Sequence, residues 1–190
     1  MIALTILALV AVNVTMVSKT GGSAVRHGSF MSMLQDDVDL TLDRVKLAVM
    51  ASSADNVEPR FEAPLSSPEI NYSISLGVQS GEAVMSDPER IRWEDAGPGG
   101  GRVTWTQNPA LETEHTVVWS NWVPSLYQGE TANGNDDNGN ELSDETGLAF
   151  EVVQENLSSL EVYIHLTIER TNPDGREVPA SRRVNVTCRN

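Results

Sequence analysis

The stretch that decides the fold is residues 30–51, which read FMSMLQDDVDLTLDRVKLAVMA. Its apolar residues recur at spacings of four, four, three and four, which is the period of an α-helix with one buried face. This face consists of Leu34, Val38, Leu42, Val45 and Val49. Ser52, Ser53 and Pro59 follow and are typical of a helix end. We therefore expect an amphipathic helix that packs on a sheet.

Downstream of residue 70 the hydrophobic period changes from 3.6 to 2, which indicates strands. Apolar and polar residues alternate over residues 70–78 and again over 160–168, where His165 falls on the polar face and is expected to be solvated. Shorter extended segments are predicted at 91–94, 102–106, 115–119 and 148–152. The turn at 172–175, Asn-Pro-Asp-Gly, joins the 160–168 strand to a closing strand at 182–188. The predicted fold class is α+β, with a long N-terminal hydrophobic helix packed on an antiparallel β-sheet head.

Residues 1–18 carry no charge, and the first charged residue is Lys19. At ~1.5 Å per residue this helix would cover roughly 27 Å, just under a bilayer core of about 30 Å. A cleaved signal and a buried core helix are the alternatives. No basic residue precedes the apolar run, which disfavours a signal, and the run is apolar on every face, which disfavours a core helix. We expect a transmembrane or filament-core helix with these candidate membrane and assembly residues: Ile2, Leu4, Ile6, Leu7, Leu9, Val10, Val12 and Val14.

The overall charge excludes some classes of function. Asp and Glu total 27 against 13 Lys and Arg, giving a net charge of −14. Such a chain repels nucleic acid, and it holds no basic run that would offset this. Nucleophile–base motifs, phosphate loops and zinc motifs are absent from the sequence, so we expect neither catalysis nor a small-molecule substrate. Cys188 is the single cysteine, which excludes an intrachain disulfide.

One acidic segment, residues 131–145, suggests a chemical role. Asp136, Asn138, Asn140 and Asp144 occupy relative positions one, three, five and nine, and the Leu142 carbonyl occupies position seven. Such alternate spacing of oxygen donors is typical of calcium loops. The pattern is incomplete, because position six is Glu141 and position twelve is Gly147.

A shifted register puts Asp136, Asn138, Gly139 and Glu145 at positions three, five, six and twelve, with Gly134 at position one. The loop resembles thrombospondin-type or dockerin-type calcium loops, and the alternative is a solvated Asn/Asp/Gly turn without metal. The candidate cofactor is calcium, with these candidate ligands: Asp136, Asn138, Asn140, Leu142, Asp144 and Glu145.

The first residues, MIALTILALVA, resemble the hydrophobic N-terminus of type IV pilins and type II secretion pseudopilins. In that family a basic leader ending in Gly precedes a segment of the type Phe-Thr-Leu-(Ile/Leu)-Glu-Val-Met-Ile-Ala. This chain starts at the position of the internal Met, so the resemblance implies that the leader, the methylated Phe and the Glu are missing from it. The closing strand, Val-x-Val-x-Cys-Arg-Asn, looks like the end of J-type minor pseudopilins.

The resemblance implies a minor pseudopilin or minor pilin that undergoes prepilin N-terminal methylation. It would assemble through its N-terminal helix into a type II secretion pseudopilus, a protein-transport device, or into a type IV pilus. Its partners would be other pilin-like subunits and inner-membrane lipid. The expected location is the bacterial inner membrane, single-pass, with the globular domain in the periplasm or on a filament.

The resemblance divides the chain into a transmembrane or filament-core helix at 1–18, a junction and amphipathic helix at 19–58, and a β-rich globular domain at 59–190. Gly21 and Gly22 lie in the junction and predict a break or loosened joint in the helix. The alternative function is a membrane-anchored or secreted calcium-binding β-domain that acts as an adhesion or ligand-binding module.

Overall fold

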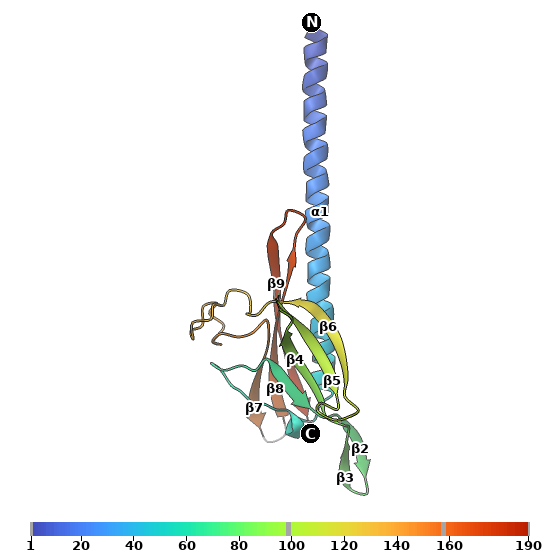
Figure 1. The fold of residues 1–190 in the computed structure, drawn as a ribbon, viewed down its shortest axis with the longest axis vertical. Helices are drawn as coiled ribbons and strands as arrows, with labels where there is room; N and C mark the ends of the chain where they lie inside the picture. Colours follow the sequence, from blue (N-terminus) through green and yellow to red (C-terminus); the bar gives the residue numbers. More distant parts are fainter. Residues whose placement is uncertain (1, 98–99, 157–158, 190) are drawn as a thin grey trace.

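The computed structural model describes the backbone of residues 2–97, 100–156 and 159–189, and side chains of residues 13–97, 100–154 and 159–188. A long helix, α1 (Ile2–Met50), is followed by a short 3-10 turn, η1 (Ala54–Asn56), and then by strands. Figure 1 shows α1 standing far beyond the strands at its N-terminal end. The strands are β1 (Glu69–Tyr72), β2 (Ser75–Gln79), β3 (Glu82–Met85), β4 (Glu89–Asp95), β5 (Gly101–Gln107), β6 (His115–Val123), β7 (Leu148–Asn156), β8 (Ser159–Thr171) and β9 (Glu177–Arg189).

The strands form three antiparallel sheets. The four-stranded sheet, called the large sheet below, has the order β1-β4-β5-β6. The second sheet is the hairpin β2-β3, and the third has the order β7-β8-β9. The predicted turn at 172–175 is confirmed, because β8 and β9 pair from Thr171↔Glu177 to Ser159↔Arg189. The Asn172 side chain stabilises this turn by accepting the backbone N–H groups of Asp174 and Arg176, both at 2.9 Å.

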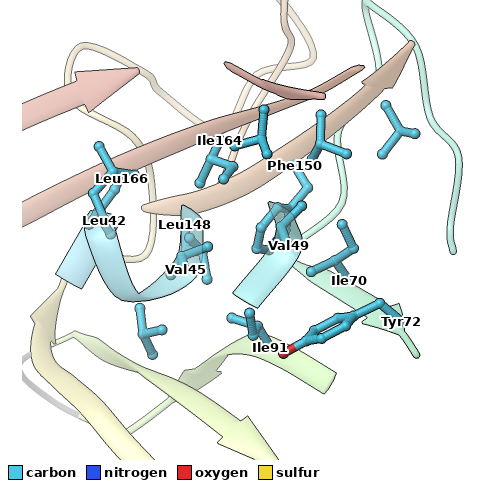
Figure 2. Packing of buried hydrophobic residues seen from close by; sticks show 14 of the residues in the cluster. Leu42, Val45, Val49, Ile70, Tyr72, Ile91, Leu148, Phe150, Ile164 and Leu166 are labelled. Carbon is cyan, nitrogen blue, oxygen red and sulfur yellow. The ribbon is translucent and has the colours of Figure 1, made fainter. Parts of the chain in front are cut away.

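The predicted apolar face of the helix is confirmed as the centre of the core. Its five members, from Leu34 to Val49, are all buried. In Figure 2, Leu42, Val45 and Val49 lie between Leu148, Phe150, Ile164 and Leu166 on one side and Ile70, Tyr72 and Ile91 on the other. The C-terminal half of α1 therefore joins the large sheet and the β7-β8-β9 sheet into one core.

The predicted α+β class is wrong, because the fold is mainly β with one α-helix. One described strand lies in a segment for which the sequence predicted no strand: β3, which pairs with β2. The predicted strand at 70–78 is in fact two strands. It bends after Tyr72, so that β1 joins the large sheet and β2 joins the projecting hairpin, where Leu76 and Val78 are exposed. Alternation in sequence predicted the extended backbone here, but not which residues are buried.

The helix is also continuous where a joint was expected. It runs through Gly21 and Gly22 without a break, and no other part of the protein packs against either glycine. The predicted break is therefore wrong, and the exposed and docked parts of α1 form one rod.

The predicted location is corrected as well. Among the residues described with their side chains, no helix is long and apolar enough to span a lipid bilayer. From Asn13 onward α1 carries Lys19, Arg26 and several small polar residues, which lower its mean hydropathy. This overturns the predicted single-pass location in the inner membrane with a periplasmic domain. Of the predicted membrane residues, Val14 is exposed, and these seven have side chains outside the described set: Ile2, Leu4, Ile6, Leu7, Leu9, Val10 and Val12.

Candidate functional site

The exposed part of α1 is the first candidate site. Every described side chain from residue 13 to residue 29 is exposed, and burial begins at Phe30. The exposed apolar side chains include Val14, Val17 and Val25, of which Val17 and Val25 are each 72% exposed. Because a helix without tertiary packing is only marginally stable in water, a rod of this kind is suited to packing against a partner.

A second apolar row lies on the docked half of the same helix. Met33, Leu40 and Leu47 are exposed and recur every seven residues, which places them on one face after about two turns each. At 3.6 residues per turn, this face points away from the buried face of Leu34 and Val45. The helix thus presents apolar side chains to solvent along both its free and its docked part.

The acidic segment forms the second candidate site, and the residues on either side of it contact β8. The backbone N–H of Tyr127 donates to the Glu145 carbonyl at 2.8 Å, and that of Gln128 donates to Thr167 Oγ1 at 3.0 Å. On the other side of the loop, the N–H of Thr167 donates to the Gly147 carbonyl at 2.7 Å. The connection between β6 and β7 is therefore bonded to β8 at both ends, and its Tyr127–Gln128 end lies over the face that carries His165 and Thr167.

This cover changes the environment of His165, which the sequence placed in solvent. His165 is only 1% exposed, so that prediction is wrong. Its ring packs edge-on against Tyr127 with ring centroids 5.7 Å apart, and neither ring nitrogen has a hydrogen-bond partner. Burial, assisted by the charge of Arg183, lowers the pKa of His165 from 6.5 to about 4. The imidazole is therefore neutral at pH 7.

The predicted calcium ligands fall into two groups. Asp136 and Asp144 organise the turns of the loop: Asp136 accepts the backbone N–H groups of Gly139 and Glu141 at 2.6 and 2.8 Å, and Asp144 accepts those of Asn133 and Gly134 at 2.9 and 2.8 Å. Although desolvation acts to raise the pKa of Asp136, these N–H donors outweigh it and lower the pKa. Leu142 has a fully buried side chain.

Asn138, Asn140 and Glu145 do come together. The carboxamide nitrogens of both asparagines donate to the same oxygen, Glu145 Oε1, the bond from Asn138 measuring 2.9 Å. Their own oxygens hold the local turns, since Asn138 Oδ1 accepts the N–H of Asn140 and Asn140 Oδ1 accepts the N–H of Leu142, both at 3.0 Å. Glu145 itself is only 1% exposed.

Glu130 is a member of this cluster that the sequence analysis missed. Its Oε1 accepts the backbone N–H groups of Asp137 and Asn138 at 3.2 and 3.1 Å. Burial and then the charge of Glu145 raise the pKa of Glu130. Glu130 immediately precedes the predicted loop, so the signal was an acidic residue just outside the assumed boundary.

Within the described part of the chain, no group of three or more His, Cys, Asp or Glu side chains is arranged to hold a metal ion. The cluster above contains two carboxylates and two carboxamides, and calcium accepts amide oxygens as readily as carboxylates. Its chemistry therefore favours a hard cation with oxygen ligands over zinc, which prefers nitrogen and sulfur.

Comparison of the chain with protein-family models, with curated proteins and with solved structures found no match. The resemblance to pilins therefore remains an expectation from the sequence.

Proposed function

We propose that this protein is a pilin-like structural subunit that assembles with other pilin-like subunits, in the manner of a minor pseudopilin or minor pilin. The observation that carries the proposal is the part of α1 from residue 13 to residue 29, whose side chains are all exposed and which bears Val14, Val17 and Val25. Apolar side chains gathered on an otherwise unsupported helix are typical of an interaction site. Helix–helix packing between subunits would bury them.

The docked half of α1 supports the same role. Because the helix is continuous from Ile2 to Met50, the position of the head is fixed relative to the free half (Figure 1). Subunits that pack through their helices would thus hold their heads in a defined orientation. A structural subunit of this kind needs no active site, because its role is to pack against its neighbours.

The test is the oligomeric state of the full chain, measured by sedimentation velocity over a range of protein concentrations. We expect the wild type to associate with rising concentration. Val17→Asp and Val25→Asp each put a charge on the free helix, ahead of the first buried residue, Phe30. They should shift the population to monomer at least tenfold, since burying an unpaired carboxylate is unfavourable.

Leu111→Asp is the matched control, because Leu111 is an exposed leucine in a loop of the head, 56% exposed. This variant should associate like the wild type, and all variants should melt at the same temperature as monomers. A wild type that stays monomeric at every concentration would contradict the proposal and favour the single-module alternative. Association that survives both helix variants would place the interface on the head instead.

A further inference from the structure

The acidic loop contains two buried carboxylate oxygens that the protein leaves without a partner. Glu145 Oε1 receives the carboxamides of Asn138 and Asn140, whereas its Oε2 is buried and has no hydrogen-bond partner. Glu130 repeats the arrangement: its Oε1 receives two backbone N–H groups, and its Oε2 is buried and unpartnered. Buried polar atoms are nearly always satisfied in folded proteins, so two such oxygens in one loop require an explanation.

The electrostatic situation strengthens this requirement. In the described residues, neither glutamate forms an ion pair with Lys, Arg or His, although Arg183 and Arg182 lie on nearby β9. The charge of Glu145 acts on Glu130, so the two carboxylates are close enough to repel each other. Burying a carboxylate beside a second one is unfavourable unless a positive charge compensates it. The described residues do not supply that charge, and a cation bound from solution would.

We propose that Glu130 and Glu145 bind a calcium ion, with the side chains of Asn138 and Asn140 completing the protein's share of the site. Calcium takes six to eight oxygen ligands from a flexible loop, and the two unpartnered carboxylate oxygens provide its anchors. Each Asn oxygen accepts one backbone N–H and keeps a second lone pair for the ion. Water from the exposed side of the loop fills the remaining positions.

The calcium ligands proposed here differ from those that the sequence spacing predicted. Asp136 and Asp144 stabilise the turns of the loop by accepting backbone N–H groups. The cation is bound by Glu130 and Glu145 instead. Because the Glu145 carbonyl also accepts the N–H of Tyr127, a cation at Glu145 would fasten the loop to the segment that covers His165. Calcium thereby stabilises the cover of β8 and leaves α1 untouched, so the site is independent of assembly.

The experiment uses the full chain, with calcium chloride as the probe and EGTA as the metal-free reference. Isothermal titration calorimetry should show one site per chain with a Kd on the order of 10⁻⁴ M. At about 100-fold excess over Kd, the wild-type Tm should rise by roughly 5–10 °C. Magnesium chloride at the same concentration should produce a markedly smaller shift, because Mg²⁺ demands a tighter octahedral shell.

Glu145→Gln and Glu130→Gln each remove one anchor and preserve side-chain shape. Both should lose the heat of binding and the calcium-dependent rise in Tm. In EGTA each should melt no lower than the wild type, because it removes repulsion between the carboxylates. Glu141→Gln is the matched control: it removes an exposed charge from the same loop and should keep the full calcium response.

The result that overturns the proposal is a wild type with no heat of binding and equal Tm in calcium and EGTA. Equal shifts with calcium and magnesium would also overturn it, because they would reflect charge screening of an acidic chain. If Glu145→Gln fails to fold, Glu130→Gln decides in its place. A calcium response retained by Glu130→Gln and lost by Glu141→Gln would contradict the assigned ligands.

Discussion

His165 is a buried histidine, and in the described residues no hydrogen-bond acceptor or acidic side chain is placed to stabilise its protonated form. It lies on β8 beneath Tyr127, its ring nitrogens make no hydrogen bonds, and Arg183 sits opposite it on β9. Protonation inside this site is unfavourable because burial and the Arg183 charge both oppose it. Protonation of His165 is therefore coupled to folding.

The pH dependence follows from the direction of the shift. The pKa of His165 falls from 6.5 to about 4 on folding, so between these values the unfolded chain binds the proton and the folded chain does not. Stability is complete above pH 6.5 and declines as the pH falls toward 4. We expect a loss of about 2 kcal/mol between pH 7 and pH 5 from this residue.

Urea unfolding of the wild type and of His165→Phe at both pH values measures that loss. Phe keeps the ring against Tyr127 and cannot be protonated, so the variant should show a pH dependence smaller by about 2 kcal/mol. His115→Phe, on the exposed part of β6, is the control and should behave like the wild type. If the unfolding free energy changed equally with pH in the wild type and in His165→Phe, the pKa of His165 would not be lowered in the folded protein.

At the residue scale, the sequence identified most of the candidate ligand residues but did not predict which side chains are buried. The alternation of 160–168 assigned His165 correctly to the face opposite Ile164, but it could not show that Tyr127 packs over that face. For the same reason Asn138, Asn140 and Glu145 were identified as candidate ligands, whereas Glu130 was not. Which carboxylate oxygens remain unpartnered depends on the loop's own hydrogen bonds, and these are not encoded in spacing.

At the scale of elements, the helix was the most predictable part because its packing repeats along the chain. The stripe from Leu34 to Val49 follows from periodicity alone, and the structure buries all of it. The predicted break at Gly21 and Gly22, by contrast, is absent from the helix. Glycine disfavours a helix by about 1 kcal/mol relative to Ala, which lowers stability without fixing where a helix ends.

Two leucines on α1 test the docking of this stripe. Leu34 is fully buried, whereas Leu47 is 61% exposed on the opposite face. Leu34→Ala should lower the unfolding free energy by about 2–5 kcal/mol through lost burial and the cavity left behind. Leu47→Ala should change it by less than about 0.5 kcal/mol. The two changes have the same helix propensity cost, so urea unfolding at low protein concentration isolates packing, and equal losses would refute the docked face.

At the scale of the whole molecule, the arrangement of sheets could not be read from the strands. Each strand from β4 to β9 was anticipated at least in part, because alternation and turn residues are local signals. The division at Tyr72 sends β1 to the large sheet and β2 to the hairpin. It depends on which strand each part pairs with: Ile70 pairs with Ile91 on β4, and Gly77 pairs with Val84 on β3. The mainly β class emerges only when those pairings are known.

Arg170 is the residue that joins the layers of the molecule outside the apolar core. From β8 its Nη2 pairs with Asp37 Oδ2 of α1 at 3.0 Å, and its guanidinium lies 4.8 Å from the centroid of the Trp122 ring on β6. One side chain thus connects the helix, the large sheet and the β7-β8-β9 sheet. Arg170 and Asp37 are only partly exposed, so solvent weakens their ion pair less than a surface pair, whereas Trp122 is 49% exposed.

We expect Arg170→Ala to lower the unfolding free energy by about 1–2 kcal/mol, from the ion pair and the cation–π contact together. Arg170→Lys should recover only part of this, because Lys keeps the charge and loses the planar stacking group. Arg182→Ala is the control: its pair with Asp39, at 3.5 Å, joins two side chains that are about half exposed, so its loss should stay below about 0.5 kcal/mol.

Urea unfolding in low and high salt separates the two parts of the Arg170 contribution. Salt screens the pair with Asp37, whereas the stacking on Trp122 persists, so roughly half of the loss should remain at 1 M salt. If the loss of unfolding free energy vanished at 1 M salt, Arg170 would contribute only a screened surface ion pair. A loss that remains, combined with the continuous helix, would mean that the orientation of the head on α1 is held by packing and by this one cation together.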